Sequence, residues 1–338
     1  MAPQSDSPSV SVCIPTYNGA KYLQACLESA LNQTLDDIEI VVVDDASTDD
    51  TVAIVEHFIA SDHRVRLFHN EANLGLVQNW NQSIKNARGS WIKPLFQDDT
   101  LDPGCVETLL KHAIDERSLV SGCFRRFIFE ADFLKSSEQM YLGNREFVSS
   151  QFQHGVLRPE EIATLAMDQL GSNFFGEPIV ALIHRSVFDK VGYFDDALAQ
   201  RCDTEFWVRA GVNFGLSMVR EDLATYRVHG STTSAQNYAR RQFADEWLDQ
   251  VVILHHFLFD PVYEPLRIIA KQSSEFRNLV NRFWDSCHYA RSIVQEASCP
   301  EGVAKKNDWE RVANIYPRIA DVSIDKTISR WVRHLGRA

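Results

Sequence analysis

The order of apolar and polar residues predicts strands and helices in alternation over the first third of the chain. Short apolar runs rich in β-branched residues have the length and composition of buried strands. Between them, apolar residues recur at helical spacing, as Leu23 and Leu27 do. This alternation indicates a mainly parallel sheet with right-handed crossovers. We expect strands at 10–14, 38–43, 65–68 and 91–96, and helices at 21–32, 52–59, 76–87 and 103–115.

The second half of the chain has a less regular pattern and ends in a long helical region. The pattern weakens between 131 and 159, which indicates a long surface excursion, functional or mobile. Beyond the last expected strand the apolar spacing is almost wholly helical. The sequence therefore predicts an α/β domain over 1–232, with halves at 9–115 and 116–232, and a helical C-terminal region over 233–338. Further strands are expected at 118–130, 179–184 and 224–228, and a helix at 205–212.

Composition and charge narrow the classes of function. The chain has 34 basic and 46 acidic residues, a net charge of -12, which argues against nucleic acid as a partner. Its seven cysteines form no CxxC pair, a pattern typical of buried free thiols in a reducing compartment and not of structural zinc. The first residues lack the features of a signal peptide, and no apolar run approaches the ~18 to 20 residues that span a bilayer. We therefore expect a cytoplasmic protein, free or peripheral on the inner face of the cytoplasmic membrane.

Polar residues, several of them acidic, come directly after three of the expected strands. In open α/β sheets, ligands bind beyond the carboxyl ends of the strands. Carboxylates gathered at one sheet edge repel each other unless hydrogen bonds or a cation offset the repulsion. The sequence therefore predicts a ligand site with a divalent cation at this edge. The three segments are Pro15-Thr16-Tyr17-Asn18-Gly19, Asp44-Asp45-Ala46-Ser47 and Gln97-Asp98-Asp99.

Four segments in register resemble a known family. In chain order they read IPTYNGAKYLQACLESALNQT, IEIVVVDDASTDDT, NLGL and LFQDD. In that order and spacing they resemble the inverting family 2 glycosyltransferases of the GT-A fold, over residues 9 to 232. The resemblance implies a hexosyltransferase of the bacterial cell-surface polysaccharide type. It also implies a Rossmann-like, mainly parallel sheet flanked by helices, in which 9–115 bind a nucleoside diphosphate sugar and 116–232 face the acceptor.

The resemblance assigns donor binding to residues near the ends of the first strands. It implies that Asp45 accepts the N3–H of a uracil-type base and that Thr16 and Tyr17 line the base pocket. Alternatively, Asp44 and Asp45 only cap the following helix. In this register we favour donor binding, with UDP-sugars as the expected donors. The full set implied by the resemblance is Pro15, Thr16, Tyr17, Asn18, Asp44, Asp45, Asn73, Gly75, Gln97 and Asp98.

The same resemblance implies a metal ion on Asp98. Mg²⁺ or Mn²⁺ would bridge this carboxylate to the donor diphosphate, since both ions take hard oxygen ligands and often few protein carboxylates. The chain departs from the family's DXD signature because Phe96 replaces the first acid. Asp99 either compensates for the missing acid or caps the next turn. His229, at a strand end and followed by glycine and serine, is expected to help Asp98 hold the metal; a structural role is the alternative.

An acidic segment at the start of a helix is expected to supply the catalytic base. Residues 203–209 resemble a motif of the family, and matching that motif backwards from its end places Asp203 on the base. An inverting transfer needs one carboxylate to take the proton of the acceptor hydroxyl. Cys202 replaces the acid that often precedes the base, so a second carboxylate must be Glu205 or be missing. Helix capping by Asp203 is the alternative.

The remaining segments suggest partners. Gly176-Glu177-Pro178 either edges the acceptor cleft or forms an ordinary turn. Residues 324–338 have one apolar face and basic residues elsewhere, so they either lie on an anionic membrane or dock as an ordinary helix. The acceptor that the resemblance implies is a glycan or a lipid-linked glycan. Aromatic residues in the C-terminal helices indicate core packing or a homo-oligomer interface.

Two other classes of function compete with a transferase. A catalytically inactive nucleotide-sugar-binding protein is the alternative, because Phe96 and Cys202 stand where acids are expected. A dinucleotide-dependent oxidoreductase would share the doubly wound sheet, but it needs a GxGxxG turn after the first strand, where this chain has only Asn18-Gly19. A nucleotidyltransferase would need a basic, glycine-rich start, which the sequence lacks. The acids at the strand ends therefore favour sugar transfer.

Overall fold

The computed structural model describes residues 7–130, 138–232, 247–296 and 300–320. These residues form two compact units, and the chain passes between them more than once before residue 202. The expected division into 1–232 and 233–338 therefore stays a prediction. The first unit contains the described residues up to Pro159, Asn173–Asp196 and 202–232, and the second contains Glu160–Ser172, Ala197–Arg201 and the described residues from 247 onward.

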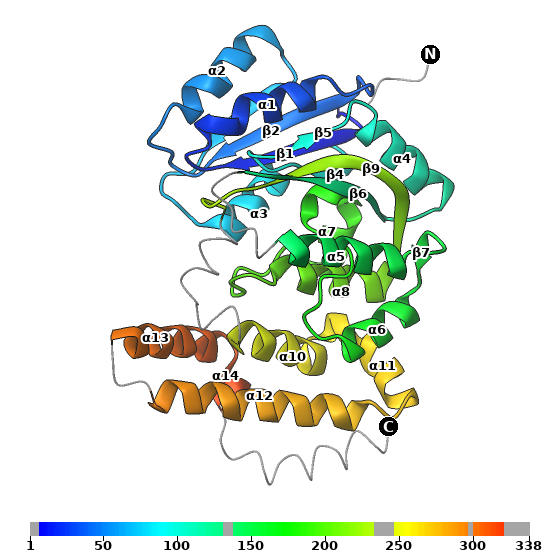
Figure 1. The fold of residues 1–338 in the computed structure, drawn as a ribbon, viewed down its shortest axis with the longest axis vertical. Helices are drawn as coiled ribbons and strands as arrows, with labels where there is room; N and C mark the ends of the chain where they lie inside the picture. Colours follow the sequence, from blue (N-terminus) through cyan, green and yellow to red (C-terminus); the bar gives the residue numbers. More distant parts are fainter. Residues whose placement is uncertain (1–6, 131–137, 233–246, 297–299, 321–338) are drawn as a thin grey trace. The chain divides into compact units, whose positions relative to one another are not determined.

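A central sheet organises the first unit (Figure 1). On one side, four strands run parallel in the order β3, β2, β1, β4. Their apolar sequences suit burial on both faces, and every residue of β1 and β2 is buried. The strand order reverses between β1 and β4, and such switch points are where open sheets bind ligands. These strands are β1 (Val10–Thr16), β2 (Ile38–Asp44), β3 (Val65–His69) and β4 (Trp91–Pro94).

The other side of the sheet has mixed strand directions. Here β8 runs antiparallel to β4 and to β6, whereas β6 and β9 are parallel. The register of β6 against β9 shifts on both sides of Phe124, and irregularities of this kind bend a strand. The predicted fold, a mainly parallel sheet flanked by helices with a helical C-terminal region, is confirmed. The remaining strands are β5 (Thr100–Leu101), β6 (Val120–Phe129), β7 (Val156–Leu157), β8 (Ala181–His184) and β9 (Leu216–Val228).

Helices cover both faces of the sheet (Figure 1). Helix α1 packs beside α2 on one face, whereas α3 packs on β1 and β2 from the other face. The buried side of α1 contains Leu23 and Leu27, as their helical spacing predicted. The helices of this unit are α1 (Ala20–Leu31), α2 (Thr51–Ser61), α3 (Leu76–Asn86), α4 (Cys105–Asp115), α5 (Glu138–Gln151), the 3-10 turn η2 (Pro178–Val180), α7 (Arg185–Val191) and α8 (Cys202–Phe214).

The segment predicted to be a long surface excursion contains regular structure. Helix α5 fills residues 138–151, and the short strand β7 pairs with β9. The sequence pattern is weak here because only Tyr141 and Val148 are buried on α5. The prediction of a long loop was therefore wrong for α5 and β7, while residues 131–137 lie outside the described part.

The second unit is helical, as the apolar spacing predicted. Its core contains Leu254, Phe257 and Phe283, each at most 1% exposed. No helix in the described ranges combines the length and apolar character needed to cross a bilayer. The expected membrane segment, 324–338, lies outside the described residues. The helices are α6 (Pro159–Asp168), α10 (Asp249–Phe259), the 3-10 turn η4 (Pro261–Tyr263), α11 (Glu264–Gln272), α12 (Phe276–Glu296), α13 (Pro300–Ile315) and α14 (Pro317–Ala320).

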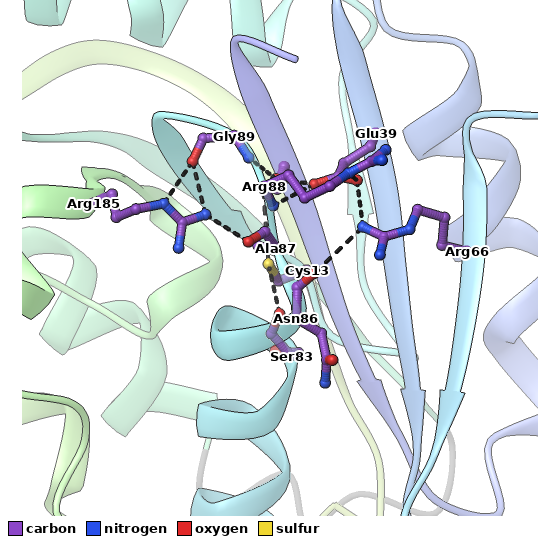
Figure 2. Close-up of polar contacts among 10 residues, drawn as sticks. Cys13, Glu39, Arg66, Ser83, Asn86, Ala87, Arg88, Gly89 and Arg185 are labelled. Carbon is purple, nitrogen blue, oxygen red and sulfur yellow. Dashed lines mark hydrogen bonds and ion pairs between the residues drawn. The ribbon is translucent and has the colours of Figure 1, made fainter. Parts of the chain in front are cut away.

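The buried carboxylate of Glu39 ties together the beginnings of the central strands (Figure 2). It accepts hydrogen bonds from the Ser11 hydroxyl and the Arg88 N–H, both at 2.6 Å, and pairs with the Arg66 guanidinium at 2.7 Å. Arg185 donates to two carbonyl oxygens of the same α3–β4 loop. Burial alone would raise the pKa of Glu39, but the hydrogen bonds from Ser11, Arg88 and Arg66 outweigh it and lower the pKa. This cluster holds the loop against the end of the sheet opposite the predicted ligand site.

Candidate active site

The loops that follow β1, β2 and β4 meet at the switch point of the sheet. Thr16 and Asp44, the last residues of β1 and β2, are register partners. Gln97, which follows β4, accepts hydrogen bonds from the Thr16 hydroxyl at 2.6 Å and from the Tyr17 N–H at 2.8 Å. The structure therefore brings together the three polar segments that the sequence singled out.

Several predicted donor-binding residues build this edge of the sheet. Pro15 is buried within β1 opposite Val43, and the Thr16 hydroxyl donates its hydrogen bond to Gln97. Asn18 accepts a hydrogen bond from the N–H of Thr48 at 2.8 Å, which joins the β1 and β2 loops. The Tyr17 side chain, in contrast, is 45% exposed, so its ring offers an aromatic face to a ligand. Its predicted contact with a nucleotide base stays a prediction.

Asp45 is buried and holds the loop that leads into α3. Its Oδ1 accepts hydrogen bonds from Asn70 Nδ2 at 2.8 Å and Leu74 N–H at 2.9 Å, and its Oδ2 accepts from Gly75 N–H at 3.0 Å. Asn73 Oδ1 accepts from the same Gly75 N–H at 3.0 Å, and Gly75 has a φ of +86° that favours glycine. A carboxylate has about four acceptor positions. Asp45 therefore retains about one position for a ligand.

Asp44 is buried as well, but its carboxylate is only partly used. Oδ2 accepts a hydrogen bond from Ser47 N–H at 3.1 Å and lies 3.9 Å from Nδ1 of His69. Oδ1 is buried without a hydrogen-bond partner among the described residues. Neither Asp44 nor Asp45 is the N-cap of α2, since that position belongs to Asp50. The helix-capping alternative therefore does not describe these two acids.

Asp98 and His229, the predicted metal ligands, face each other although 131 residues separate them in the sequence. Asp98 Oδ2 lies 3.0 Å from His229 Nε2, and His229 Nδ1 lies 2.8 Å from the Ser231 hydroxyl. The Tyr22 ring packs against the imidazole with 4.9 Å between centroids. Because Ser231 and Tyr22 hold the ring, Nε2 is directed at Asp98.

A divalent ion fits this pair of side chains. Adjacent ligands of an octahedral ion at ~2.1 Å are ~3 Å apart, which matches the separation of Asp98 Oδ2 and His229 Nε2. Within the described ranges, no group of three or more His, Cys, Asp or Glu side chains could hold a metal. Two protein ligands leave several positions to oxygens of a phosphate ligand and water, as Mg²⁺ and Mn²⁺ commonly accept.

Asp99 anchors β9 to the loop that carries Asp98. It is 1% exposed, and its Oδ1 accepts a hydrogen bond from the Arg227 N–H at 2.7 Å. Arg227 Nε in turn donates to the carbonyl oxygen of Asp98 at 3.1 Å. Burial, followed by the charge of Asp98, raises the pKa of Asp99 well above its ordinary value. Asp99 thus fixes the position of its neighbour and does not cap the next helix, whose N-cap is Gly104.

Phe96, which stands where the family signature has an acid, is part of an aromatic stack. Its ring lies over Trp80 with 4.7 Å between centroids and 26° between planes. Trp80 also contacts the Phe194 ring edge-on at 5.5 Å. Phe96 and Trp80 are both half-buried. At this position the chain therefore has an aromatic contact with Trp80 where the family signature has a negative charge.

Asp203, the predicted base, is the second residue of α8 and is half-buried. Its Oδ2 accepts a hydrogen bond from Asn173 Nδ2 at 2.9 Å, and its Oδ1 accepts from the N–H of Thr204 at 2.6 Å. Burial, followed by the negative charge of Glu177, raises the pKa of Asp203 to about 7, against the hydrogen bonds from Thr204. A carboxyl group with a pKa near neutrality is suited to general-base chemistry.

Glu177 is an acid at this site to which the sequence assigned no chemistry. It forms an ion pair with Arg125, a fully buried residue of β6. Burial, followed by the charge of Glu177, raises the pKa of Tyr226, with smaller effects of Asp99 and Asp98. Glu177, Asp99 and Asp98 therefore all act on the pKa of this one tyrosine. The effect of Glu177 on neighbouring pKa values could not be predicted from the sequence, because Gly-Glu-Pro is also the composition of an ordinary turn.

Glu205, the second predicted catalytic acid, takes part in a buried ion pair within α8. It is 1% exposed, and its two oxygens accept hydrogen bonds from Arg209 at 2.9 Å and 2.8 Å. Arg209 also donates to the carbonyl oxygen of Tyr193 at 2.8 Å. This ion pair binds α8 to the segment before it. The charge of Glu205 is thus paired with Arg209, and its catalytic role stays a prediction.

Comparison with known sequences adds independent evidence. The sequence model of glycosyl transferase family 2 matches residues 11–192, more than half of the chain. The protein MT1568 of Mycobacterium tuberculosis is 31% identical over 75% of this chain and 77% of its own length. Chondroitin synthase of Escherichia coli is 43% identical, but over 33% of this chain and 16% of the synthase. The chain thus spans only a small part of that synthase.

Comparison with solved structures confirms the fold. TarS of S. aureus in complex with UDP-GlcNAc superposes with a TM-score of 0.56 at 17% identity, covering 92% of this chain and 82% of that chain. The mannosyltransferase PcManGT of Pyrobaculum calidifontis in complex with GDP-Man and Mn²⁺ gives a TM-score of 0.55 at 17% identity, covering 93% and 82%. The architecture is thus of the GT-A type. Together with the family match over more than half of its length, this shows that the chain belongs to glycosyl transferase family 2 and is a glycosyltransferase.

Proposed function

We propose that the chain transfers a sugar from a nucleoside diphosphate sugar to an acceptor hydroxyl, with inversion at the anomeric carbon and with Asp203 as the general base. The expected donor is a UDP-sugar, and the expected acceptor is a glycan or lipid-linked glycan in the synthesis of a surface polysaccharide or glycoconjugate. The observation that carries this proposal is the environment of Asp203, a half-buried carboxyl group beside Glu177 whose pKa is raised to about 7. UDP-GlcNAc in TarS and the similarity to chondroitin synthase support it.

In the proposed reaction the acceptor oxygen bonds to the anomeric carbon while the bond from that carbon to the diphosphate oxygen breaks. Asp203 takes the proton of the acceptor hydroxyl, and the nucleoside diphosphate leaves with the electron pair of the broken bond. Hydrogen bonds from Asn173 and Thr204 restrain the two oxygens of Asp203. A base held in one orientation loses less entropy on the way to the transition state.

We propose that the nucleotide binds at the switch point between β1 and β4. Three features support this assignment: the exposed ring of Tyr17, the buried Oδ1 of Asp44 without a partner in the described chain, and the remaining acceptor position of Asp45. The ring can stack on a base, and a carboxylate oxygen can accept the N3–H of uracil. The hydrogen bond from Thr16 to Gln97 and the one from the Thr48 N–H to Asn18 hold these loops in place.

We propose that Asp98 and His229 hold a divalent ion, Mn²⁺ or Mg²⁺. When bound, the ion supplies positive charge that stabilises the departing diphosphate. The separation of the two side chains supports this, and PcManGT is a neighbour of the same fold in complex with Mn²⁺. The chain itself orients the pair, since Ser231 bonds to His229 and Asp99 anchors the Asp98 loop to β9.

A thermal-shift screen identifies the donor class. The purified chain is heated with Mn²⁺ and UDP-GlcNAc, GDP-mannose or a dTDP-sugar, and the largest stabilisation is expected with UDP-GlcNAc. Stabilisation by GDP-mannose alone would contradict the assignment of uracil to the site. Binding of a donor without any turnover by the parent chain would instead favour the alternative, a nucleotide-sugar-binding protein.

The role of Asp203 is tested by Asp203→Asn, which keeps the shape of the side chain and removes the base. We expect the variant to retain its thermal shift with the donor found in the screen and to lose sugar transfer by at least about 100-fold. The matched control is Asp50→Asn at an exposed aspartate, which should leave turnover unchanged. Turnover of Asp203→Asn near the parent rate would refute the base assignment.

The metal assignment is tested by Asp98→Ala. Calorimetric titration with UDP, in Mn²⁺ and again in EDTA, should show that the variant loses the metal-dependent part of the affinity. Asp36→Ala, at an exposed position, should retain the dependence on Mn²⁺. If Asp98→Ala bound UDP as tightly as the parent and with the same dependence on Mn²⁺, Asp98 would be excluded as a metal ligand.

We also propose a cytoplasmic location with peripheral contact to the inner face of the cytoplasmic membrane through 324–338. The support is the sequence pattern alone, because this segment lies outside the described residues. Co-sedimentation with anionic liposomes should decrease when residues 324–338 are removed, and unchanged co-sedimentation would discard the membrane contact. Homo-oligomerisation stays a prediction.

A further inference from the structure

Asn173 connects the proposed base to helix α5. Its Nδ2 donates to Asp203 Oδ2 at 2.9 Å, and its backbone carbonyl oxygen accepts a hydrogen bond from Asn144 Nδ2 at 2.7 Å. Asn144 lies on α5, and its Oδ1 accepts a hydrogen bond from Arg125 Nη2 at 2.9 Å. Arg125 forms the ion pair with Glu177. A continuous chain of polar contacts thus runs from the base through two asparagines to the buried arginine.

The orientation of the Asn173 amide is fixed by the backbone. Its Oδ1 accepts hydrogen bonds from the N–H groups of Phe175 at 3.2 Å and Gly176 at 2.7 Å. A flipped amide would turn its NH₂ group toward these two donors, which cannot accept a hydrogen bond. The NH₂ group therefore has to face Asp203.

We infer that Asn173 is the positioning residue of the Asp203 carboxylate and that Asn144 holds Asn173 in place from α5. The inference rests on the proposed role of Asp203 as base and adds the residues that orient its carboxylate. Together with the N–H of Thr204 on Oδ1, the Asn173 amide restrains both oxygens, so the carboxylate cannot rotate freely about its χ2 angle. The ionised form of Asp203 gains from this bond, because a donor to a carboxylate favours its charged state. The charged groups near Asp203 are Glu177 and, through its ion pair, Arg125.

Asn173→Asp isolates this hydrogen bond with the smallest change in shape. The new carboxylate keeps an oxygen for the N–H groups of Phe175 and Gly176, so the local backbone retains its support. It replaces the donor facing Asp203 by a second acceptor, and two facing carboxylates repel. The matched control is Asn86→Asp, which makes the same chemical change at a side chain that donates to the Gln82 carbonyl oxygen on α3.

The exchange variant Asn173→Asp with Asp203→Asn restores a donor and an acceptor in reversed order. Melting temperatures are measured at pH 8.5 for the parent, both single variants and the exchange variant. If the two side chains bond directly, the exchange variant melts about 2 to 4 °C above the sum of the two single shifts. Additive shifts would show that the two side chains do not bond directly, and this would overturn the inference.

Turnover separates this inference from the proposed function. With UDP-GlcNAc and Mn²⁺, release of UDP by Asn173→Asp should decrease at least about tenfold, and the acid limb of its pH profile should move up by about one pH unit. Asn144→Asp should decrease turnover less, and the control should match the parent. The exchange variant should stay inactive although its stability recovers, because it lacks the base.

The remaining outcomes are distinguishable. Recovered stability with parent-like turnover of both Asp203→Asn and Asn173→Asp would refute Asp203 as base while leaving the hydrogen bond intact. Loss of turnover in Asp203→Asn with parent-like turnover and an unmoved pH profile in Asn173→Asp would keep the base and overturn Asn173 as its positioning residue.

Discussion

The burial of Asp203 predicts that the proposed base costs the protein stability at alkaline pH. The folded chain holds the proton of this carboxyl group up to a pKa of about 7, whereas an ordinary aspartate loses it near 3.8. The contribution of the protonated group to stability is therefore complete below 3.8 and is lost as the pH rises through 7. Above that pH the folded chain carries a half-buried charge beside Glu177. Asp203→Asn removes the charge and keeps the volume.

The size of the effect follows from the pKa shift. A difference of about 3 pKa units corresponds to about 4 kcal/mol between the two protonation states. Because Asp203 is only half-buried, solvent screening reduces this, and we take about 2 kcal/mol. For a unit of this size, that is a rise in melting temperature of about 4 to 8 °C. The asparagine also places its NH₂ group against the NH₂ group of Asn173, which costs about 1 kcal/mol at every pH.

Melting temperatures of the parent and of Asp203→Asn at pH 5 and pH 8.5 separate these two effects. The lost hydrogen bond shifts the difference between variant and parent equally at both pH values, so it cancels. The unfolded chain already ionises this aspartate at pH 5, so only about two thirds of the effect lies between pH 5 and pH 8.5. The difference should therefore rise by about 3 to 5 °C over this interval in favour of the variant. The exposed control, Asp50→Asn, should show no such change. A difference that is the same at both pH values would refute the burial argument.

Three further predictions concern stability away from the base. Glu39→Ala leaves two arginines and the Ser11 hydroxyl without their buried acceptor, so it should lower the free energy of unfolding by about 3 kcal/mol at pH 7 in a urea titration. The loss should become smaller as the pH falls through the lowered pKa of Glu39, and a loss below ~1 kcal/mol at pH 7 would contradict this prediction. Phe96→Asp restores the acid of the family signature but faces the Trp80 ring, so it should cost about 2 kcal/mol in the same titration, and a stabilised variant would contradict the packing role. Burial, followed by the charges of His256 and Arg318, lowers the pKa of His255 to about 4, so the stability of the parent should decrease as the pH falls from 6.5 toward 4. His255→Leu should remove that part of the pH dependence, and thermal melts of the parent and the variant across this pH range would measure it.

Local patterns sufficed for the first half of the fold. The continuous apolar runs of β1 and β2 predict buried parallel strands, because only helices on both faces of a sheet can cover such runs. The acids that follow these strands were predicted to meet, since the carboxyl ends of parallel strands lie at one edge of the sheet. Helix α5 escaped prediction because only two of its residues are buried. Its place depends on polar contacts of Asn144 and Arg145 with distant residues, which leave no apolar period.

The site illustrates the same division. The residue pattern placed Asp98 among the acids at the strand ends, and the family resemblance implied its metal and the role of Asp203 as base. Two residues rotate a helix by about 200°, so Glu205 lies on a different face of α8 from Asp203. Only the tertiary structure decides that His229 reaches Asp98, that burial and then the charge of Glu177 raise the pKa of Asp203, and that Asn173 bonds to Asp203. These contacts join residues far apart in sequence, and their energies depend on burial and on distances that no local pattern encodes.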